Sequence, residues 1–309
     1  MRSATSRSSR RQVLLVGGTL AVATSLTGLV RWVQAKDPGR PAPDGRPRML
    51  GAAPSIFIGH GSPMNAVQDN AFTRHLKQWG RELGLPQAIL VVSAHWLTER
   101  ELRVSVSELP PTIHDFDGFP ADLSTMRYPA PGAPALARDA AARLAPRAVG
   151  QSERGLDHGA WTVLAHLYPA ADVPVFQLSI DITRTAAYHH ALGRALAGLR
   201  EHGVLIVGSG NVVHNLAATM RGQPETSRGL TPWARNFDAH VKQALDAKDV
   251  PALLAYEQLS VEAAMAVPFP DHYFPLLYAL GAAQSNEAPR HVFEGFQAGT
   301  LSMRCVQWG

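Results

Sequence analysis

The chain has 309 residues, of which 46% are hydrophobic and 17% charged, and it contains a single cysteine. This composition excludes a disordered chain, because it has enough apolar residues to form a hydrophobic core. A single cysteine also excludes a disulfide framework and a cysteine-based metal site. The formal net charge of +4 raises the question of a nucleic acid or an acidic membrane as partner, and the answer depends on where the basic residues lie.

The first 35 residues have the order of a secretory signal, which is a basic segment, an apolar segment and a cleavage site. They contain five arginines and no acidic residue, and the apolar segment runs from residue 13 to residue 30. The pair Arg10-Arg11 before it resembles a twin-arginine signal, with Val13 where that pattern usually has Phe. We therefore expect residues 1–35 to be a signal peptide cleaved after Ala35. The twin-arginine translocation machinery would then deliver the protein to the periplasm or another extracytoplasmic space.

The alternative for the same segment is an uncleaved N-terminal membrane anchor, since its 18 apolar or small residues just reach the length that spans a bilayer. If the signal is cleaved, we expect no stable membrane anchor. Without residues 1–35 the chain has 24 basic and 25 acidic residues, so no nucleic-acid partner is expected. Residues 36–51 are rich in proline and glycine and are expected to form a flexible linker.

The remainder of the chain, residues 52–309, has no composition break or repeat and is expected to form one domain. Short apolar runs predict buried strands at residues 55–58, 88–93, 173–179 and 204–208, with weaker candidates at 102–106 and 301–306. Helical periodicity alternates with these runs, at residues 70–83, 134–146, 160–167, 185–201, 231–246, 249–257 and 273–281. This alternation predicts an α/β fold with a central, largely parallel or mixed sheet flanked by helices.

Histidines follow three of the predicted strands. His60, His95 and His214 stand at or just after the carboxyl ends of those strands. Ligand sites in parallel sheets form beyond these ends, so the three side chains are expected at the same rim. His158 and His272 lie at the starts of two predicted helices. Neutral imidazole is the commonest metal ligand and is well suited to proton transfer near neutral pH, so the cluster predicts a catalytic metal site.

Eight motifs, in order along residues 52–309, carry a family resemblance: Gly59-His-Gly-Ser-Pro63, Ser93-Ala-His-Trp96, Thr112-Ile-His-Asp-Phe116, Tyr128-Pro-Ala-Pro131, Asp157-His-Gly159, Gln177-Leu-Ser-Ile-Asp181, Ser209-Gly-Asn-Val-Val-His-Asn-Leu216 and His272-Tyr-Phe-Pro-Leu-Leu277. They resemble the class III (LigB-type) extradiol ring-cleaving dioxygenases, and more narrowly the 4,5-DOPA dioxygenase-like branch. The resemblance implies a metal-dependent catalytic domain that opens a DOPA-like catechol ring with O2 to give a semialdehyde. The export signal is a departure, because members of this family are usually cytoplasmic.

The resemblance also implies roles for individual residues. The implied metal ligands are His60, His95 and His272, with His214 close enough to be a fourth. In the wider class the third ligand is a carboxylate, for which Asp271 is the fallback here. His214 or His158 would transfer protons as general base and acid. Fe(II) is the metal implied for activity, and Zn(II) also suits a site of three or four imidazoles.

Aromatic residues near the histidines would bind the catechol, namely His114, Trp96, Phe116 and Tyr273, with Phe119 as a further member. For Trp96 and Tyr273, packing in the core is the alternative. Two other functions stay open. One is a zinc-dependent hydrolase, because imidazole-bound zinc activates water. The other is an exported metal-binding protein without turnover, although the glycine- and aromatic-rich loops build more of a pocket than metal binding requires.

Overall fold

The computed structural model describes residues 45–147, 149–220 and 231–309. The predicted signal peptide, residues 1–35, and most of the predicted linker lie outside this part of the chain. Among the described residues, no helix combines the length and the apolar character that a membrane span needs.

The end of the predicted linker, residues 45–51, is attached to the domain. The carbonyl oxygen of Pro47 accepts a hydrogen bond from the backbone N–H of Leu85 at 2.9 Å. Arg46 is buried, and its guanidinium carbon lies 5.3 Å from the ring centroid of Tyr168. These contacts attach residues 46–49 to the domain.

The centre of the domain is an eight-stranded mixed sheet, which confirms the predicted fold class. Its strands in spatial order are β4 (Val149–Ser152), β3 (Leu102–Ser105), β5 (Val175–Asp181), β2 (Ala88–Thr98), β6 (Val204–Gly210), β1 (Ser55–Gly59), β10 (Cys305–Trp308) and β7 (Arg290–Phe293). The central strands β5, β2, β6 and β1 run parallel, whereas β10 and β7 are antiparallel to their neighbours. The short strands β8 (Phe296–Gln297) and β9 (Leu301–Ser302) pair separately.

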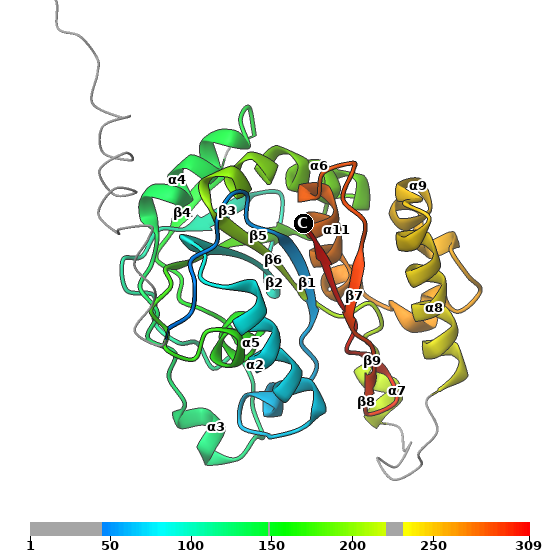
Figure 1. Cartoon of the computed structure of the whole chain (residues 1–309). Coiled ribbons are helices and arrows are strands. Elements are labelled where there is room, and N and C mark those ends of the chain that lie inside the picture. The colour runs from blue at the N-terminus through cyan, green and yellow to red at the C-terminus, as the bar shows by residue number, and fades with distance from the viewer. Residues whose placement is uncertain (1–44, 148, 221–230) are drawn as a thin grey trace, which may run out of the picture. The chain divides into compact units, whose positions relative to one another are not determined.

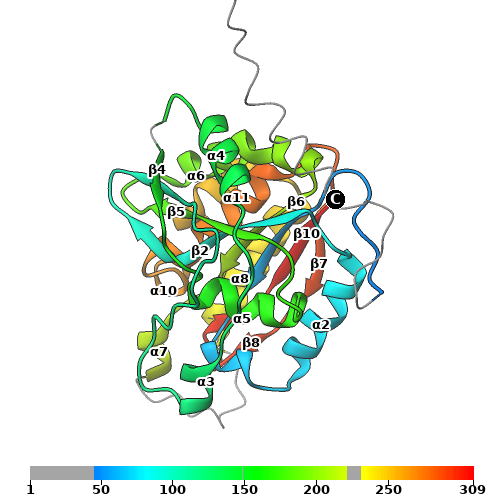
Figure 2. The same ribbon diagram turned by 90° about the vertical axis from the view of Figure 1, so that its left-hand side faces the viewer.

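Helices cover both faces of the sheet (Figures 1 and 2). On one side lie α2 (Ala71–Leu83) and α5 (His158–Leu167), and on the other α4 (Pro134–Arg143), α6 (Ala186–Leu196) and α11 (Phe274–Ala282). In β2, Leu90 and Val92 pack in the core with α6 and α11, whereas Ile89 and Val91 pack in the core with α2 and α5. This burial on both faces explains why the central strands are continuous apolar runs in the sequence.

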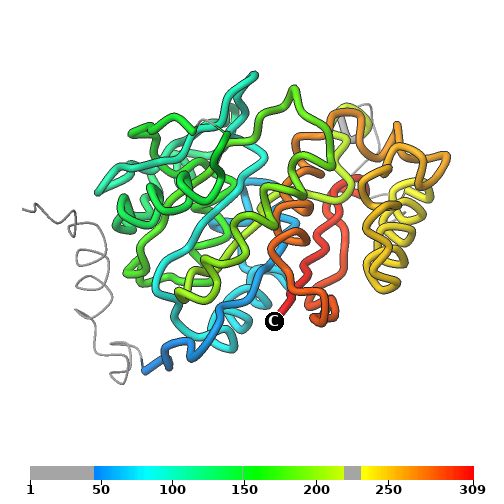
Figure 3. The backbone as a smooth tube through the Cα atoms, turned by 90° about the horizontal axis from the view of Figure 1, so that it is seen from above, coloured from blue at the N-terminus to red at the C-terminus, as the bar shows by residue number. Residues whose placement is uncertain are grey.

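The segment from residue 231 to 266 lies at one end of the domain beside the C-terminal strands (Figures 1 and 3). It contains α8 (Pro232–Asp246), α9 (Val250–Leu254) and α10 (Ala263–Ala266), and Val241 and Leu245 join the same core as α11. The remaining short helical segments are η1 (Pro63–Ala66), α3 (Ala121–Thr125), η2 (Ala197–His202), α7 (Leu216–Met220), η3 (Tyr256–Gln258) and η4 (Pro270–His272).

Candidate active site

A cavity of about 720 Å³ lies at the carboxyl ends of β1, β2 and β6. This is where parallel sheets place their ligand sites. Its lining brings together all five histidines singled out in the sequence: His60, His95, His158, His214 and His272. They come from five separate segments of the chain, which the sheet and the helix ends around it bring to one place.

The imidazole of His60 is held with one nitrogen directed at the other histidines. Its Nδ1 lies 3.0 Å from the Oγ of Ser209, and that hydroxyl donates to the carbonyl oxygen of Gly159 at 2.5 Å. Because a hydroxyl has only one proton to donate, Nδ1 of His60 must donate to Ser209. The other nitrogen, Nε2, therefore keeps a free lone pair, and it lies 3.2 Å from Nε2 of His95.

Burial and neighbouring imidazoles lower the pKa of three of these histidines, His60, His95 and His214, so that they are neutral near pH 7. Burial lowers the pKa of His60 and of His95 well below the ordinary value, and the neighbouring histidines lower each pKa further. For the same reasons the pKa of His214 falls to about 3. Neutral imidazole is the form that binds a metal ion, so the electrostatics of the cluster suit metal binding.

His158 gives the tightest group together with His60 and His95. Ligand atoms from these three side chains all lie within 4.8 Å of one another, close enough to hold one metal ion. The rings of His95 and His158 are 3.8 Å apart between centroids. The resemblance implies His272 as the third ligand and His158 as a proton-transfer residue. The distances make His158 a second candidate for the third ligand.

His272 lies beside this group, at the end of η4. Its ring centroid is 5.3 Å from that of His60 and 5.0 Å from that of His95. Its Nε2 is buried and makes no hydrogen bond within the described residues. His214 stacks on it, with centroids 3.5 Å apart and rings 5° from parallel. A buried nitrogen without a partner is costly, which is consistent with a metal ligand at His272.

Two carboxylates lie next to the histidines. Asp115 Oδ1 accepts the backbone N–H of His158 at 2.9 Å and lies 3.1 Å from its Nδ1. Burial alone would raise the pKa of Asp115, but the hydrogen bonds and charge of His158 outweigh it, so the pKa lies below the ordinary value. Asp271, the fallback ligand, lies 3.1 Å from Nδ1 of His272 through Oδ2. Both carboxylates can therefore orient a histidine.

The N-terminus of α5 is fixed by a buried carboxylate that our sequence analysis did not single out. Asp157 caps the helix by accepting the backbone N–H of Ala160, and it also binds the Ser93 hydroxyl at 2.6 Å and the Gln177 amide at 2.8 Å. Burial raises its pKa. Because His158 is the next residue, these bonds set its position. Asp157, Ser93 and Gln177 each begin one of the motifs that carry the family resemblance, and this was the sequence signal that could have identified them.

Phe116 and Phe119 form the aromatic part of the lining. Their ring centroids are 5.2 Å apart, and the Phe116 ring lies 5.6 Å from that of His158. Both come from the proline- and aromatic-rich loop before α3. The two rings stand at 80° to each other, and an apolar corner of this kind beside the imidazoles suits an aromatic ring.

The other predicted members of the aromatic wall, Trp96, Tyr273 and His114, are not among the residues that line this cavity. Trp96 is buried against the Arg154 guanidinium, 5.5 Å from its ring. Tyr273 is wholly buried, and its hydroxyl donates to the carbonyl oxygen of Leu253 at 3.0 Å. His114 stands behind Phe116, with Nε2 3.0 Å from the carbonyl oxygen of Met126. These positions reflect side-chain direction, which sequence proximity to a histidine does not determine.

Comparison with known proteins gives consistent results. Residues 53–304 match the family described as the catalytic LigB subunit of aromatic ring-opening dioxygenase. The chain is 47% identical over 262 residues to a 4,5-DOPA dioxygenase extradiol of Escherichia coli K12, covering 83% of this chain and 94% of that protein. It is 39% identical to a protein of the same name from Beta vulgaris, covering 80% and 93%.

A solved structure of an uncharacterized protein from Escherichia coli K12 has the same fold, with a TM-score of 0.71 and 41% identity. The match covers 83% of this chain and 100% of the chain in that structure. Fold, site and relatives together define an extradiol aromatic ring-opening dioxygenase. The chain belongs to the LigB family of aromatic ring-opening dioxygenases.

The residues present fit the metal that this family implies. Two imidazole nitrogens bound to one metal at about 2.1 Å are separated by roughly 3.0–3.4 Å. The Nε2 atoms of His60 and His95 are 3.2 Å apart. Because Nδ1 of His60 is committed to Ser209, its Nε2 offers a lone pair, and Nε2 of His95 lies at the distance that a shared metal ion would set.

Proposed function

We propose that the protein is an Fe(II)-dependent extradiol dioxygenase that opens a DOPA-like catechol with O2. The overall reaction breaks the ring carbon–carbon bond beside the diol and places both oxygen atoms of O2 in the product, a semialdehyde with a carboxyl group. The observation that supports this most directly is the 3.2 Å approach of two neutral imidazole nitrogens in a cavity that also presents a phenylalanine surface. The relatives named 4,5-DOPA dioxygenase extradiol support the substrate class.

Within this proposal, His60, His95 and His272 hold the metal. Fe(II) would supply the electron transfer that lets O2 react with the catechol. His272 is preferred to His158 as third ligand because its Nε2 is buried and makes no hydrogen bond within the described residues, and because the resemblance implies this position. His214, stacked on His272, stands close enough to be a fourth ligand.

His158 is proposed as the proton-transfer residue. Asp115 lies at its Nδ1, which leaves Nε2 on the opposite side of the ring to face the cavity. A carboxylate in this position orients an imidazole and stabilises its protonated form, as general base catalysis requires. His214 is the second candidate that the resemblance implies for this proton, but its pKa of about 3 makes it a weak base.

Phe116 and Phe119 are proposed to hold the catechol ring and to exclude water from the reacting carbon. Positioning of the ring is a large part of the catalytic effect in such a reaction. Leu97, Leu216 and Leu301 extend the apolar surface. Nothing in the comparisons favours a zinc-dependent hydrolase or a metal-binding protein without turnover.

Oxygen uptake tests the proposed function. The protein, loaded anaerobically with Fe(II) and mixed with a catechol panel that includes DOPA, should consume O2 and form a coloured ring-opened product. Zn(II), which suits the same imidazoles but has no redox chemistry, should occupy the site without oxygen uptake. Absence of uptake with every catechol would contradict the proposal.

We also propose that residues 1–35 direct export through the twin-arginine machinery to the periplasm. Support comes from the Arg10-Arg11 pair ahead of an apolar segment. Replacement of both arginines by lysine should keep the protein in the cytoplasm. Cell fractionation would detect this, and a protein found in the membrane fraction instead would indicate an uncleaved anchor.

A further inference from the structure

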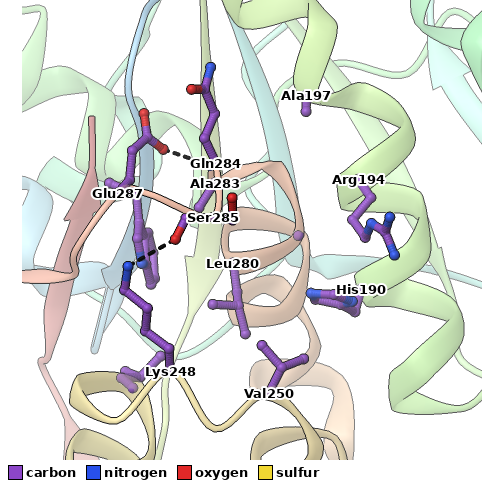
Figure 4. A pocket seen from close by; sticks show the side chains of 13 residues that line it. His190, Arg194, Ala197, Lys248, Val250, Leu280, Ala283, Gln284, Ser285 and Glu287 are labelled. Carbon is purple, nitrogen blue, oxygen red and sulfur yellow. Dashed lines mark hydrogen bonds between the residues drawn. The ribbon is translucent and has the colours of Figure 1, made fainter.

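A second cavity, of about 550 Å³, lies between α6, the end of α11 and the turn that joins α8 to α9 (Figure 4). It shares no lining residue with the histidine site. Its apolar surface includes Leu245, Val250, Leu280 and Trp308. Cavities of about 300–1,000 Å³ with an apolar lining and a few polar groups are typical of small-molecule sites.

Basic side chains face this cavity from two directions. Figure 4 shows His190 and Arg194 on one wall and Lys248 on the other, with Leu280 between them. The carboxylate in the lining, Glu287, is already neutralised, because its two oxygens bind the Arg200 guanidinium at 2.6 and 2.8 Å.

The positive charge of two of these side chains is available to a ligand. Within the described residues, Arg194 has no carboxylate at ion-pair distance. The Lys248 ammonium donates to the carbonyl oxygen of Ser285 at 2.9 Å, which uses one of its three N–H donors. The cavity therefore combines an apolar floor with an excess of positive charge, and this combination complements an anion with an apolar body.

Lys248 occupies a backbone position that usually favours glycine. Its φ is 53°, in the left-handed region, directly after α8. Its N–H binds the carbonyl oxygen of Leu245 at 2.9 Å, and the N–H of Asp249 binds that of Ala244 at 2.8 Å, which is the Schellman pattern. Glycine is the commonest residue here because a Cβ is unfavourable in this conformation. Lysine therefore occupies a position that glycine would also suit, and its ammonium lies at the cavity.

The wall that bears Arg194 is fixed. A Cβ added to Gly281 would lie 2.2 Å from the carbonyl oxygen of His190, and one added to Gly193 would lie 2.3 Å from that of Tyr278. The backbones of α6 and α11 are therefore in direct contact along this wall. A preformed cavity lowers the entropic cost of binding a small ligand.

We propose that this cavity binds a small monocarboxylate with an apolar body, such as an aromatic acid. The Arg194 guanidinium offers paired donors that match the two oxygens of a carboxylate, and Lys248 adds a second cation. Leu280, Val250 and Trp308 receive the apolar body. This site is independent of the proposed ring-opening reaction.

The test compares benzoate with benzamide, its uncharged analogue of the same shape, by calorimetric titration of the full-length protein. Benzoate should bind at least about tenfold more tightly than benzamide. Arg194→Gln and Lys248→Gly should each weaken benzoate binding about tenfold or more. Arg138→Gln, at an exposed position on α4 outside the cavity, is the matched control and should leave the affinity unchanged.

Lys248→Gly separates binding from folding, because glycine suits the left-handed position and should keep the melting temperature at least as high as that of the unaltered protein. The proposal is overturned if benzoate does not bind at concentrations up to about 50 mM, a Kd too weak for a specific site. It is also overturned if benzamide binds equally well. Equal benzoate affinity in the Arg194→Gln protein would place the ligand elsewhere, for example among the histidines, and would likewise overturn it.

Discussion

The carboxylate of Asp115 accepts the backbone N–H of His158 at 2.9 Å, and the same oxygen lies 3.1 Å from the ring Nδ1. The second oxygen of the same carboxylate lies 3.9 Å from Nδ1 of His95. Asp115 belongs to the loop that also carries Phe116. One residue thus connects the surface proposed to hold the catechol with the histidine proposed to move its proton.

Replacing Asp115 by Asn should lower the turnover number by about 10- to 100-fold, the usual effect of losing a residue that orients a functional histidine. The amide keeps the shape but not the charge that stabilises protonated His158. Metal content and the KM for catechol should change little, because neither depends directly on this carboxylate. Asp117→Asn, two residues away on the same exposed loop, is the matched control and should retain full turnover. An unchanged turnover number for Asp115→Asn would show that the contact is not needed for proton transfer.

Metal analysis of single variants should distinguish the two candidate third ligands. We expect His272→Ala, like His60→Ala and His95→Ala, to lose bound Fe(II). His158→Ala should retain the metal and lose about 10²–10⁴-fold in turnover, as expected for removal of a general base. The opposite pattern, metal lost from His158→Ala and kept in His272→Ala, would make the group His60, His95 and His158 the ligand set.

The positions of these histidines could be predicted because ligand sites in parallel sheets form beyond the carboxyl ends of the strands. A strand that is buried on both faces is an apolar run in the sequence, and His60 and His95 come at the ends of such runs. Side-chain direction was harder to predict. Trp96 follows His95 within β2, but it does not line the cavity, whereas Ala94, His95 and Leu97 do. An alternation count would not have shown this, because the pairing of β2 is irregular between Val92 and Leu97.

Edge strands were missed for a related reason. Strand β4 has the sequence Val149-Gly-Gln-Ser152, and its residues are exposed or partly exposed. Strand β7 begins at an exposed Arg290. Neither has the apolar run that marks a central strand. The contacts that orient the histidines, such as Ser209 with His60, join residues far apart in the chain, and no local pattern reports them.

Gly159 is a position where one added methyl group should disturb the site. A Cβ there would lie 2.4 Å from Oγ of Ser93 and 2.9 Å from Cδ2 of His95. Gly159→Ala should therefore displace His95 and reduce both Fe(II) affinity and turnover, by about 10-fold or more, since small displacements at reacting groups are costly. Gly150→Ala in β4, where a Cβ would meet only ordinary contacts at 3.6 Å, is the control. Equal activity of the two variants would contradict the tight packing inferred around His95.

His189 should make the protein sensitive to acid. It is fully buried on α6, with Nδ1 3.0 Å from the Tyr278 hydroxyl and its ring 4.2 Å from that of Phe274, and burial lowers its pKa to about 4. The unfolded chain binds a proton near pH 6.5, whereas the folded protein does so only near pH 4. The contribution of His189 to the free energy of unfolding should therefore be constant above about pH 7 and fall as the pH decreases from 6.5 towards 4.

At pH 5 the loss from this residue should be about 2 kcal/mol, since each pH unit between the two pKa values contributes about 1.4 kcal/mol. Other buried histidines add to the total, so the residue is isolated by comparing urea unfolding of the unaltered protein and His189→Leu at pH 7.5 and pH 5. The variant should lose less free energy of unfolding between the two pH values, by about 2 kcal/mol, whatever its stability at pH 7.5. If both proteins lose the same free energy of unfolding between pH 7.5 and pH 5, then burial does not lower the pKa of His189, and the prediction is wrong.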